Sequence, residues 1–558
     1  MGLMLTLGVS AAWSQLPRSS QQLAKRAIDR WPATQFAAPN DRGHAGLMLE
    51  AVNEEWLDTA DPIYFDYARS AADAFIAAED THSTDGGGIE PWLGREVLQL
   101  YRVTQQESYW KLAAALHERL IARQASGAGV AGESGSLEVR AETLYETEPF
   151  LAEYARTFQQ PADFSAITER FVRAGRDART VQATQRARAG LLAALVDTLP
   201  SYARSEPGRD TLLEILRSTA QAAASPHRTG SGSATGAAAP DPTADCMIAY
   251  ALARAARLGY LPSGYAQAAK RVWHGTNGPT SLTADDPEAA GAQILAAREM
   301  EMAPLARLGG GRVALVDAWF NSQQRKNAAG QMESFHYKWD DASNNGFSLL
   351  GHLFNDYGVA TETLSEAPTA ANLQSAQFYL IVSPDIPVKN PHPHYATRED
   401  AAQVAAWVRQ GGILLLMEND PANADIDHLN LIADVFGLHF NSVLSHHVDG
   451  DNFAMGRIDA AGGGALFKEP HILFMKDTCT LKLSGPARPL LVDKGDVMMA
   501  AARYGKGTVY AVVDPWLYNE YTDGRKLPRE YDNFAGAGEV LSWLMRQLPS
   551  RVRPSVNH

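Results

Sequence analysis

Four carboxylates surround a proline in the segment RAETLYETEPFLAEYA, residues 140–155. Glu142 and Glu146 are four residues apart, so in a helix both side chains lie on one face and repel each other. A carboxyl group that is close to another and partly removed from water has a raised pKa, as a general acid requires. The same spacing also fits a solvated helix end, where the helix dipole favours acidic side chains. Both interpretations of Glu142 are open here, whereas Glu148 and Glu153 are predicted to be solvated or structural.

Five further residues have side chains of the types that could complete a binding site. Glu90, in the stretch IEPWLGREVLQLY, either caps the helix that follows it or shares a proton with another carboxyl group. The guanidinium group of Arg186 could hold a carboxylate through two parallel hydrogen bonds. Trp92 and Tyr145 offer flat aromatic surfaces beside the two glutamates, and His44 precedes the apolar run GLMLEAV. Each of these residues could equally be a core or surface residue.

The elements that must position these residues are helices. Residues 15–302 repeat apolar side chains at intervals of three and four, for example in 44–56, 109–124 and 245–261. The connecting segments are short and rich in Gly, Ser and Pro. A helical domain of about ten to twelve helices fits this length, arranged either as a solenoid or as a ring of paired helices.

The pattern changes at the three glycines 309–311, and we expect residues 303–311 to be a linker. Beyond it, apolar runs such as 379–384, 411–419 and 507–516 alternate with helical stretches. This alternation predicts an α/β domain over residues 312–550, a doubly wound parallel sheet with helices on both faces. Ligands of such sheets bind beyond the carboxyl ends of the strands.

Composition and charge exclude several classes of function. The chain has 558 residues and a formal net charge of −14, which argues against binding to nucleic acid or to anionic membranes. No apolar run is long enough for a membrane span. Residues 1–14 are a possible signal peptide remnant, so we expect a periplasmic or secreted bacterial protein.

No metal site and no cofactor are predicted. Cys246 and Cys479 have neither the spacing of a zinc site nor the context of a redox motif. Histidines and acids gather at 389–395, 418–428 and 445–452, but their spacing matches no standard metal site. The acidic and aromatic stretch that follows Val513 could contact a sugar or seal an interface between the two domains.

Four segments carry a family resemblance, in the order 100–113, 144–155, 194–200 and 246–273. Together they resemble the unsaturated uronyl hydrolases of glycoside hydrolase family 105 and its relative, family 88. The resemblance implies an (α/α)6 toroid for the first domain. The segments 335–351 and 495–528 are similar to a class I glutamine-amidotransferase-like domain. Glutaminase chemistry is not expected, because no cysteine stands at a strand-to-helix elbow.

The resemblance implies an exo-acting glycoside hydrolase that removes a terminal 4,5-unsaturated uronic acid from the oligosaccharides left by polysaccharide lyases, such as those of rhamnogalacturonan. Glu142 and Glu90 match the family's two catalytic aspartates, and Arg186 matches a substrate-facing arginine. His44, Trp92 and Tyr145 are expected to contact the sugar. Two alternatives stay open, an exo-β-glucuronidase that acts on saturated glucuronic acid and a carbohydrate-binding pseudoenzyme.

Overall fold

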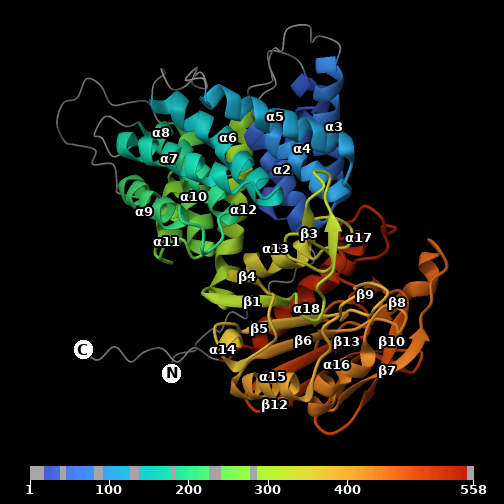
Figure 1. Ribbon diagram of the computed structural model, residues 1–558. Helices are drawn as coiled ribbons and strands as arrows, with labels where there is room; N and C mark the ends of the chain where they lie inside the picture. The colour runs from blue at the N-terminus through green and yellow to red at the C-terminus, as the bar shows by residue number, and fades with distance from the viewer. Residues whose placement is uncertain are drawn as a thin grey trace, which may run out of the picture.

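The computed structural model describes residues 18–37, 45–80, 92–125, 137–178, 184–224, 241–276 and 286–549. The predicted signal peptide remnant, residues 1–14, lies outside these ranges. The first half of the described chain is helical, and the second half builds a sheet domain beneath it (Figure 1).

Among the described residues, twelve α-helices precede the first strand. They are α1 (Ser19–Arg30), α2 (Gly46–Thr59), α3 (Pro62–Asp80), α4 (Leu93–Thr104), α5 (Glu107–Ala125), α6 (Leu137–Thr157), α7 (Pro161–Ala178), α8 (Gln185–Thr198), α9 (Arg209–Ala224), α10 (Pro242–Arg257), α11 (Tyr265–Gly275) and α12 (Pro287–Gly309). Their starts follow familiar capping chemistry. The side chains of Asp241 and Asp286 cap α10 and α12, and a proline follows each of them.

The even-numbered helices form a closed inner ring. Each of α2, α4, α6, α8, α10 and α12 contacts the next, and α12 returns to α2. The odd-numbered helices pack against the outside of this ring. The inner helices are buried on almost every side, as in the run from Leu191 to Thr198 of α8. This explains why the sequence of α8 is apolar around most of the helix rather than along one stripe. We call this domain the helical ring.

The predicted linker at 303–311 is wrong over most of its length. Helix α12 continues to Gly309, and two glycines alone separate it from strand β1 (Arg312–Asp317). Gly309 donates its backbone N–H to the carbonyl oxygen of Tyr357 at 3.0 Å. A Cβ atom on Gly309 would lie 2.4 Å from that oxygen. The glycines therefore allow a close contact between the two domains instead of a loose connection.

The second domain contains strands β1, β4 (Val359–Leu364), β5 (Phe378–Val382), β6 (Ile413–Met417), β7 (Leu438–Ser445), β10 (Thr478–Leu483), β11 (Arg488–Asp493), β12 (Asp496–Tyr504) and β13 (Gly507–Val512) in one sheet. The hairpins β2–β3 (Gln324–Lys326, Met332–Ser334) and β8–β9 (Arg457–Ala460, His471–Phe474) stand apart from it. The helices are α13 (Ser348–Asp356), α14 (Ala370–Leu373), α15 (Arg398–Gln410), α16 (Ile426–Ala433), α17 (Asn519–Thr522) and α18 (Asn533–Gln547).

The sheet is mixed, so the prediction of a parallel sheet is correct for only part of it. Strands β4, β1, β5, β6 and β13 are parallel neighbours in that order. Strands β12, β10, β7 and β11 continue the sheet in antiparallel pairs. Short turns join β11 to β12 and β12 to β13, with Gly495 and Gly505 at positive φ. Such turns are too short for a crossover helix, so these strands must reverse direction.

The two domains share a polar interface, and the stretch after Val513 is part of it. Trp56 of α2 donates its indole N–H to the carbonyl oxygen of Asp523 at 3.0 Å. The guanidinium carbon of Arg525 lies 4.7 Å from the ring centre of Phe65. The hairpin β2–β3 reaches up to the ring (Figure 1), where the backbone N–H of Ala328 donates to the hydroxyl of Tyr101. The stretch after Val513 therefore seals the interface between the domains, which was one of its two predicted roles.

Candidate active site

One end of the helical ring holds a cavity of about 370 Å³ to which all six inner helices contribute. We call it the mouth pocket. Its lining residues are Gly46, Leu47, Leu49, Glu50, Trp92, Arg95, Glu96, Tyr145, Glu146, Arg186, Gly190, Met247 and Glu288. Most of them lie at or near the first turn of their helix, where unpaired N–H groups carry a partial positive charge. The mouth pocket therefore suits a ligand with a negative group.

Glu50 of α2 carries a proton near neutral pH. Its Oε1 lies 2.8 Å from Nη2 of Arg95, whose Nη1 lies 3.3 Å from Oδ2 of Asp197. Burial raises the pKa of Glu50 to about 7, the charges of Asp197 and Glu54 add to the rise, and Arg95 opposes it. One guanidinium group is thus shared between two buried carboxylates. A carboxyl group with this pKa can give up or regain a proton at physiological pH.

Glu96 of α4 is a second carboxyl group of this kind. It is buried, and its Oε2 accepts a hydrogen bond from Nδ2 of Asn53 at 2.7 Å. Its Oε1 has no hydrogen-bond partner within the described part of the chain. Burial raises the pKa of Glu96 to about 7. Two of the four carboxyl groups in the mouth pocket are therefore about half protonated at pH 7, which reduces repulsion of an anionic ligand.

Three of the predicted site residues line the mouth pocket, namely Arg186, Trp92 and Tyr145. Nη2 of Arg186 lies 2.5 Å from Oε1 of Glu288, and its side chain is 30% exposed. Trp92 and Tyr145 are buried, with 4% and 7% of their surface exposed. Their position fits contact with a ligand, but their roles toward a sugar and a substrate carboxylate stay predictions.

The other three predicted residues cannot be placed by their side chains. Glu90 and His44 lie outside the described residues. Glu142 lies within α6, which begins at Leu137, so it is not at the helix start as the sequence had suggested. Its side chain also lies outside the described part of the structure. Glu146, one helical turn further along α6, does line the mouth pocket.

Glu148 and Glu153 are structural, as predicted. Glu148 is buried and binds Arg170 through both oxygens, at 2.7 Å from Nε and 2.6 Å from Nη2. Glu153 forms an ion pair with Arg102. In the segment 140–155, Glu146 therefore lines the mouth pocket, whereas Glu148 and Glu153 hold helices together.

Sequence reasoning missed Glu50, Arg95 and Glu96. The signal was present in the sequence for Glu50, because it stands in the apolar run GLMLEAV at the start of α2. An acid on an otherwise apolar inner helix must find a partner or hold its proton. Arg95 and Glu96 lie within one turn of Trp92, which was named as a candidate.

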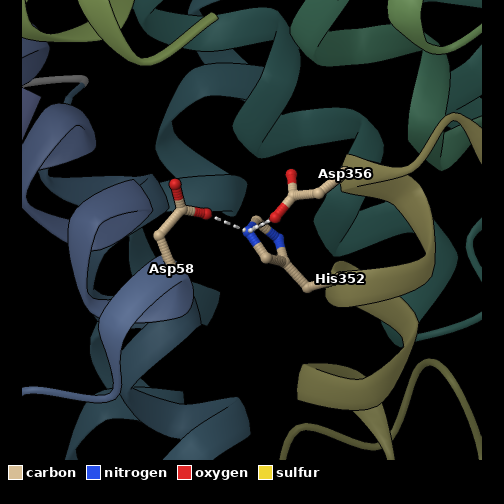
Figure 2. A group of neighbouring side chains, drawn as sticks. All are labelled: Asp58, His352 and Asp356. Carbon is tan, nitrogen blue, oxygen red and sulfur yellow. Dashed lines mark hydrogen bonds and ion pairs between the residues drawn. The ribbon is translucent and has the colours of Figure 1, made fainter. Parts of the chain in front are cut away.

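A cluster of charged residues joins the two domains at the other end of the ring, and we call it the interdomain ion cluster. Figure 2 shows Asp58 of α2 facing His352 and Asp356 of α13. Among the described residues, these three form the group whose ligand atoms lie close enough to hold a metal ion. Nη2 of Arg298 lies 2.7 Å from Asp58 Oδ1, 2.9 Å from Asp356 Oδ1 and 3.0 Å from His352 Nε2. A guanidinium group thus occupies the place that a cation would need, so these residues do not fit a metal site.

Two of the carboxylates at the strand ends of the second domain, those of Asp317 and Asp385, bind the loops that follow these strands. Asp317 accepts hydrogen bonds from the backbone N–H of Phe320 and from the hydroxyl of Tyr379, both at 2.7 Å. Asp385 accepts from the backbone N–H of Ser322 at 2.8 Å. These bonds fix the turns after β1 and β5. Asp317 and Asp385 therefore have a structural role.

Cys479 does not supply a nucleophile to the second domain. It is buried within β10, and its thiol faces the carbonyl oxygen of Val513 at 3.7 Å. Burial raises the pKa of this thiol well above its usual value. The thiolate that nucleophilic catalysis needs is therefore disfavoured.

Comparison with known proteins agrees with this geometry. Residues 19–288 match the profile of Glycosyl Hydrolase Family 88. No curated protein compared with the chain matches it. Within the described residues, no helix is long and apolar enough to cross a membrane. The family match shows that the chain carries a glycoside hydrolase domain, which corresponds to the helical ring.

Three solved structures are similar to part of the chain. A family 105 glycoside hydrolase from C. acetobutylicum is 18% identical, with a TM-score of 0.40, and the match covers 51% of this chain and 99% of that one. A family 88 glycosyl hydrolase from Bacteroides vulgatus is 14% identical, with a TM-score of 0.37, over 50% and 98%. A possible family 105 member from Salmonella enterica serovar Paratyphi A is 13% identical, with a TM-score of 0.37, over 51% and 95%.

Proposed function

We propose that the protein is an exo-acting hydrolase that removes a terminal 4,5-unsaturated uronic acid from lyase-generated oligosaccharides. The observation that carries the proposal is the composition of the mouth pocket. It places the carboxyl groups of Glu50 and Glu96, each with a pKa near 7, in one cavity with the guanidinium groups of Arg95 and Arg186. Proton donors and a carboxylate-binding fork are what this reaction needs.

The substrate's own carboxylate would bind Arg186. In the structure Arg186 already binds Glu288 and lies 3.5 Å from Asp241. A uronate carboxylate would compete with Glu288 for the guanidinium fork, which binds two oxygens at once. Partial protonation of Glu50 and Glu96 near pH 7 reduces the negative charge that opposes this exchange. Trp92 and Tyr145 would then border the apolar face of the sugar ring.

The proton would go to C4 of the enol ether. Water then adds at C5, and the resulting hemiketal opens and releases the neighbouring sugar. We assign the proton donation to Glu142, by its match to the family's catalytic aspartate. Glu50 supports it as a second carboxyl group that holds a proton at neutral pH. We expect proton delivery to limit the rate, so loss of either proton should slow catalysis.

The test follows the ultraviolet absorbance of the enol ether during incubation with lyase-generated oligosaccharides. The proposal predicts that this absorbance falls with wild-type protein, and that Glu142→Gln slows the fall by about 10²–10⁴-fold. Glu107→Gln, a change on the exposed part of α5, is the matched control and should behave as wild type. Release of glucuronic acid from saturated glucuronides incubated in parallel, without loss of the enol absorbance of the lyase products, would contradict the proposal and identify an exo-β-glucuronidase.

A further inference from the structure

A second cavity lies between the two domains, at the opposite end of the helical ring from the mouth pocket. It is a groove of about 1500 Å³, and we call it the interdomain groove. One wall comes from the ends of α6, α8 and α10 and from the start of α9. The other wall comes from Trp339, α13 and β4 of the second domain. Neither domain has this groove alone.

The groove is lined by an excess of positive charge, although the protein as a whole is negatively charged. The chain carries a net charge of −14, yet six arginines and three carboxylates line the groove. The arginines are Arg156, Arg204, Arg209, Arg217, Arg254 and Arg257, and the carboxylates are Glu206, Asp340 and Glu362. Arg204 pairs with Glu362 across the groove at 2.6 Å. Arg254 and Arg257 bind the buried carboxylate of Glu299 behind the wall.

Three arginines have no carboxylate partner among the described residues. Arg156 donates one hydrogen bond, to the carbonyl oxygen of Pro200 at 3.3 Å. Arg209 donates from Nε to the carbonyl oxygen of Tyr202, also at 3.3 Å. Arg217 is exposed. Because a guanidinium group has five N–H donors, Arg156 and Arg209 keep most of theirs for another partner.

Tyr260 marks the centre of this positive region. The guanidinium carbon of Arg209 lies 5.5 Å from the centre of its ring. Burial raises the pKa of Tyr260, and the charges of Arg209, Arg254, Arg257 and Arg156 all act to lower it. These arginines therefore place positive charge near the phenol hydroxyl, which itself can donate one hydrogen bond to an anion.

We propose that the interdomain groove is a second carbohydrate site, which binds an acidic oligosaccharide through Arg209, Arg156 and the hydroxyl of Tyr260. Trp339 lines the facing wall, where its partly buried ring is a surface for a sugar face. The anion-binding part rests on the groove alone, and the choice of a uronate oligosaccharide rests on the proposed function. A site of this size accommodates several sugar units, unlike the mouth pocket. It would hold the polymer close to the enzyme between cleavages.

The test measures binding of a short saturated oligogalacturonate by calorimetry. Wild-type protein should bind it, and Arg209→Ala should raise the Kd for binding in the groove about tenfold or more. Tyr260→Phe removes one hydroxyl group without changing shape and should weaken it about threefold to tenfold. Arg271→Ala, a change of equal charge on the exposed face of α11 and outside the groove, should leave binding unchanged.

The outcomes separate this site from the mouth pocket. If both Arg209→Ala and Tyr260→Phe bind oligogalacturonate with the Kd of the wild-type protein, the proposal is overturned. This holds even if the protein hydrolyses unsaturated uronides. Equal binding of the neutral oligogalactan of the same length overturns the role of the guanidinium groups. Displacement by inorganic sulfate at equal concentration overturns the sugar part of the site. Binding that depends on Arg209 and Tyr260 in a protein without hydrolase activity supports the groove and contradicts the proposed function alone.

Discussion

Glu50 and Glu54 stand one helical turn apart on α2 and behave in opposite ways. Glu50, in the mouth pocket, shares the guanidinium group of Arg95 with Asp197, and its pKa rises to about 7. Burial also opposes ionisation of Glu54, but Arg254 at 2.8 Å and Arg298 at 3.3 Å lower its pKa below the ordinary value. The supply of positive charge therefore explains why Glu50 titrates near pH 7 while Glu54 stays ionised.

This difference assigns separate roles to the two ends. At the mouth, carboxyl groups that keep their protons are ready for acid chemistry. At the interdomain ion cluster, Arg298 is fully buried and binds Asp58, Glu299 and Asp356. Burial acts against ionisation of Asp58 too, yet Arg298 holds its pKa well below the usual range. Ionised groups that satisfy each other in this way fix the domains together.

The largest expected effect is the loss of catalysis at the mouth. Glu142→Gln and Glu50→Gln should each lower kcat by about 10²–10⁴-fold, because each removes a proton that the reaction uses. Neither variant should lower the midpoint of thermal unfolding by much, since glutamine keeps the shape of glutamate. Steady-state kinetics and a thermal melt of each variant check both points. Full activity in Glu142→Gln, with loss in Glu50→Gln, would transfer the role of acid to Glu50.

Substitutions in the interdomain ion cluster should lower the stability of the fold. Arg298→Met leaves Asp58 and Asp356 buried without their shared partner, and the free energy of unfolding should fall by about 3–5 kcal/mol. Denaturant unfolding measures the loss. The double variant Arg298→Met with Asp58→Asn removes one stranded charge and should recover part of the stability. An unchanged free energy of unfolding in Arg298→Met would break the comparison between the two ends.

A smaller effect is expected in substrate binding. Arg186→Lys replaces a planar fork by a point charge, so KM for uronides should rise about tenfold while kcat changes less. The same variant should bind neutral analogues as wild type does. Kinetics on matched acidic and neutral substrates check this. An equal change for both substrates would assign Arg186 a structural role through Glu288 instead.

A pH dependence of stability is expected from Glu55, which follows Glu54 on α2. Glu55 is fully buried, and burial raises its pKa to about 8. The folded protein thus keeps a proton that the unfolded chain loses near the ordinary value of about 4.5. Stability from this group is complete below that value and is lost as pH rises through 8, by at most about 1.4 kcal/mol per pH unit. Glu55→Gln should flatten this decline in unfolding free energy, and an identical slope in both proteins would contradict the assignment.

The sequence predicted the larger features of the fold for physical reasons. Helical periodicity identified the first domain, and apolar runs such as 411–419 identified the parallel strands. The antiparallel strands were missed because a buried apolar run does not tell its direction; that depends on the turns between strands. Arg186 lines the mouth pocket, and its role toward a substrate carboxylate stays a prediction. Glu50 was missed because its pKa depends on Arg95 and Asp197, which come from α4 and α8 and meet Glu50 only in the closed ring.

The most direct test of the account is the pH dependence of kcat/KM for loss of the enol absorbance. The mouth is predicted to work with protonated carboxyl groups, so the rate should be highest below the pKa of about 7 that burial gives Glu50, and should fall as pH rises through that value. Glu50→Gln should show a low rate without this fall. A rate that rises through pH 7 in wild-type protein, or an unchanged profile in Glu50→Gln, would contradict the claim that protons held at the mouth of the ring drive the reaction.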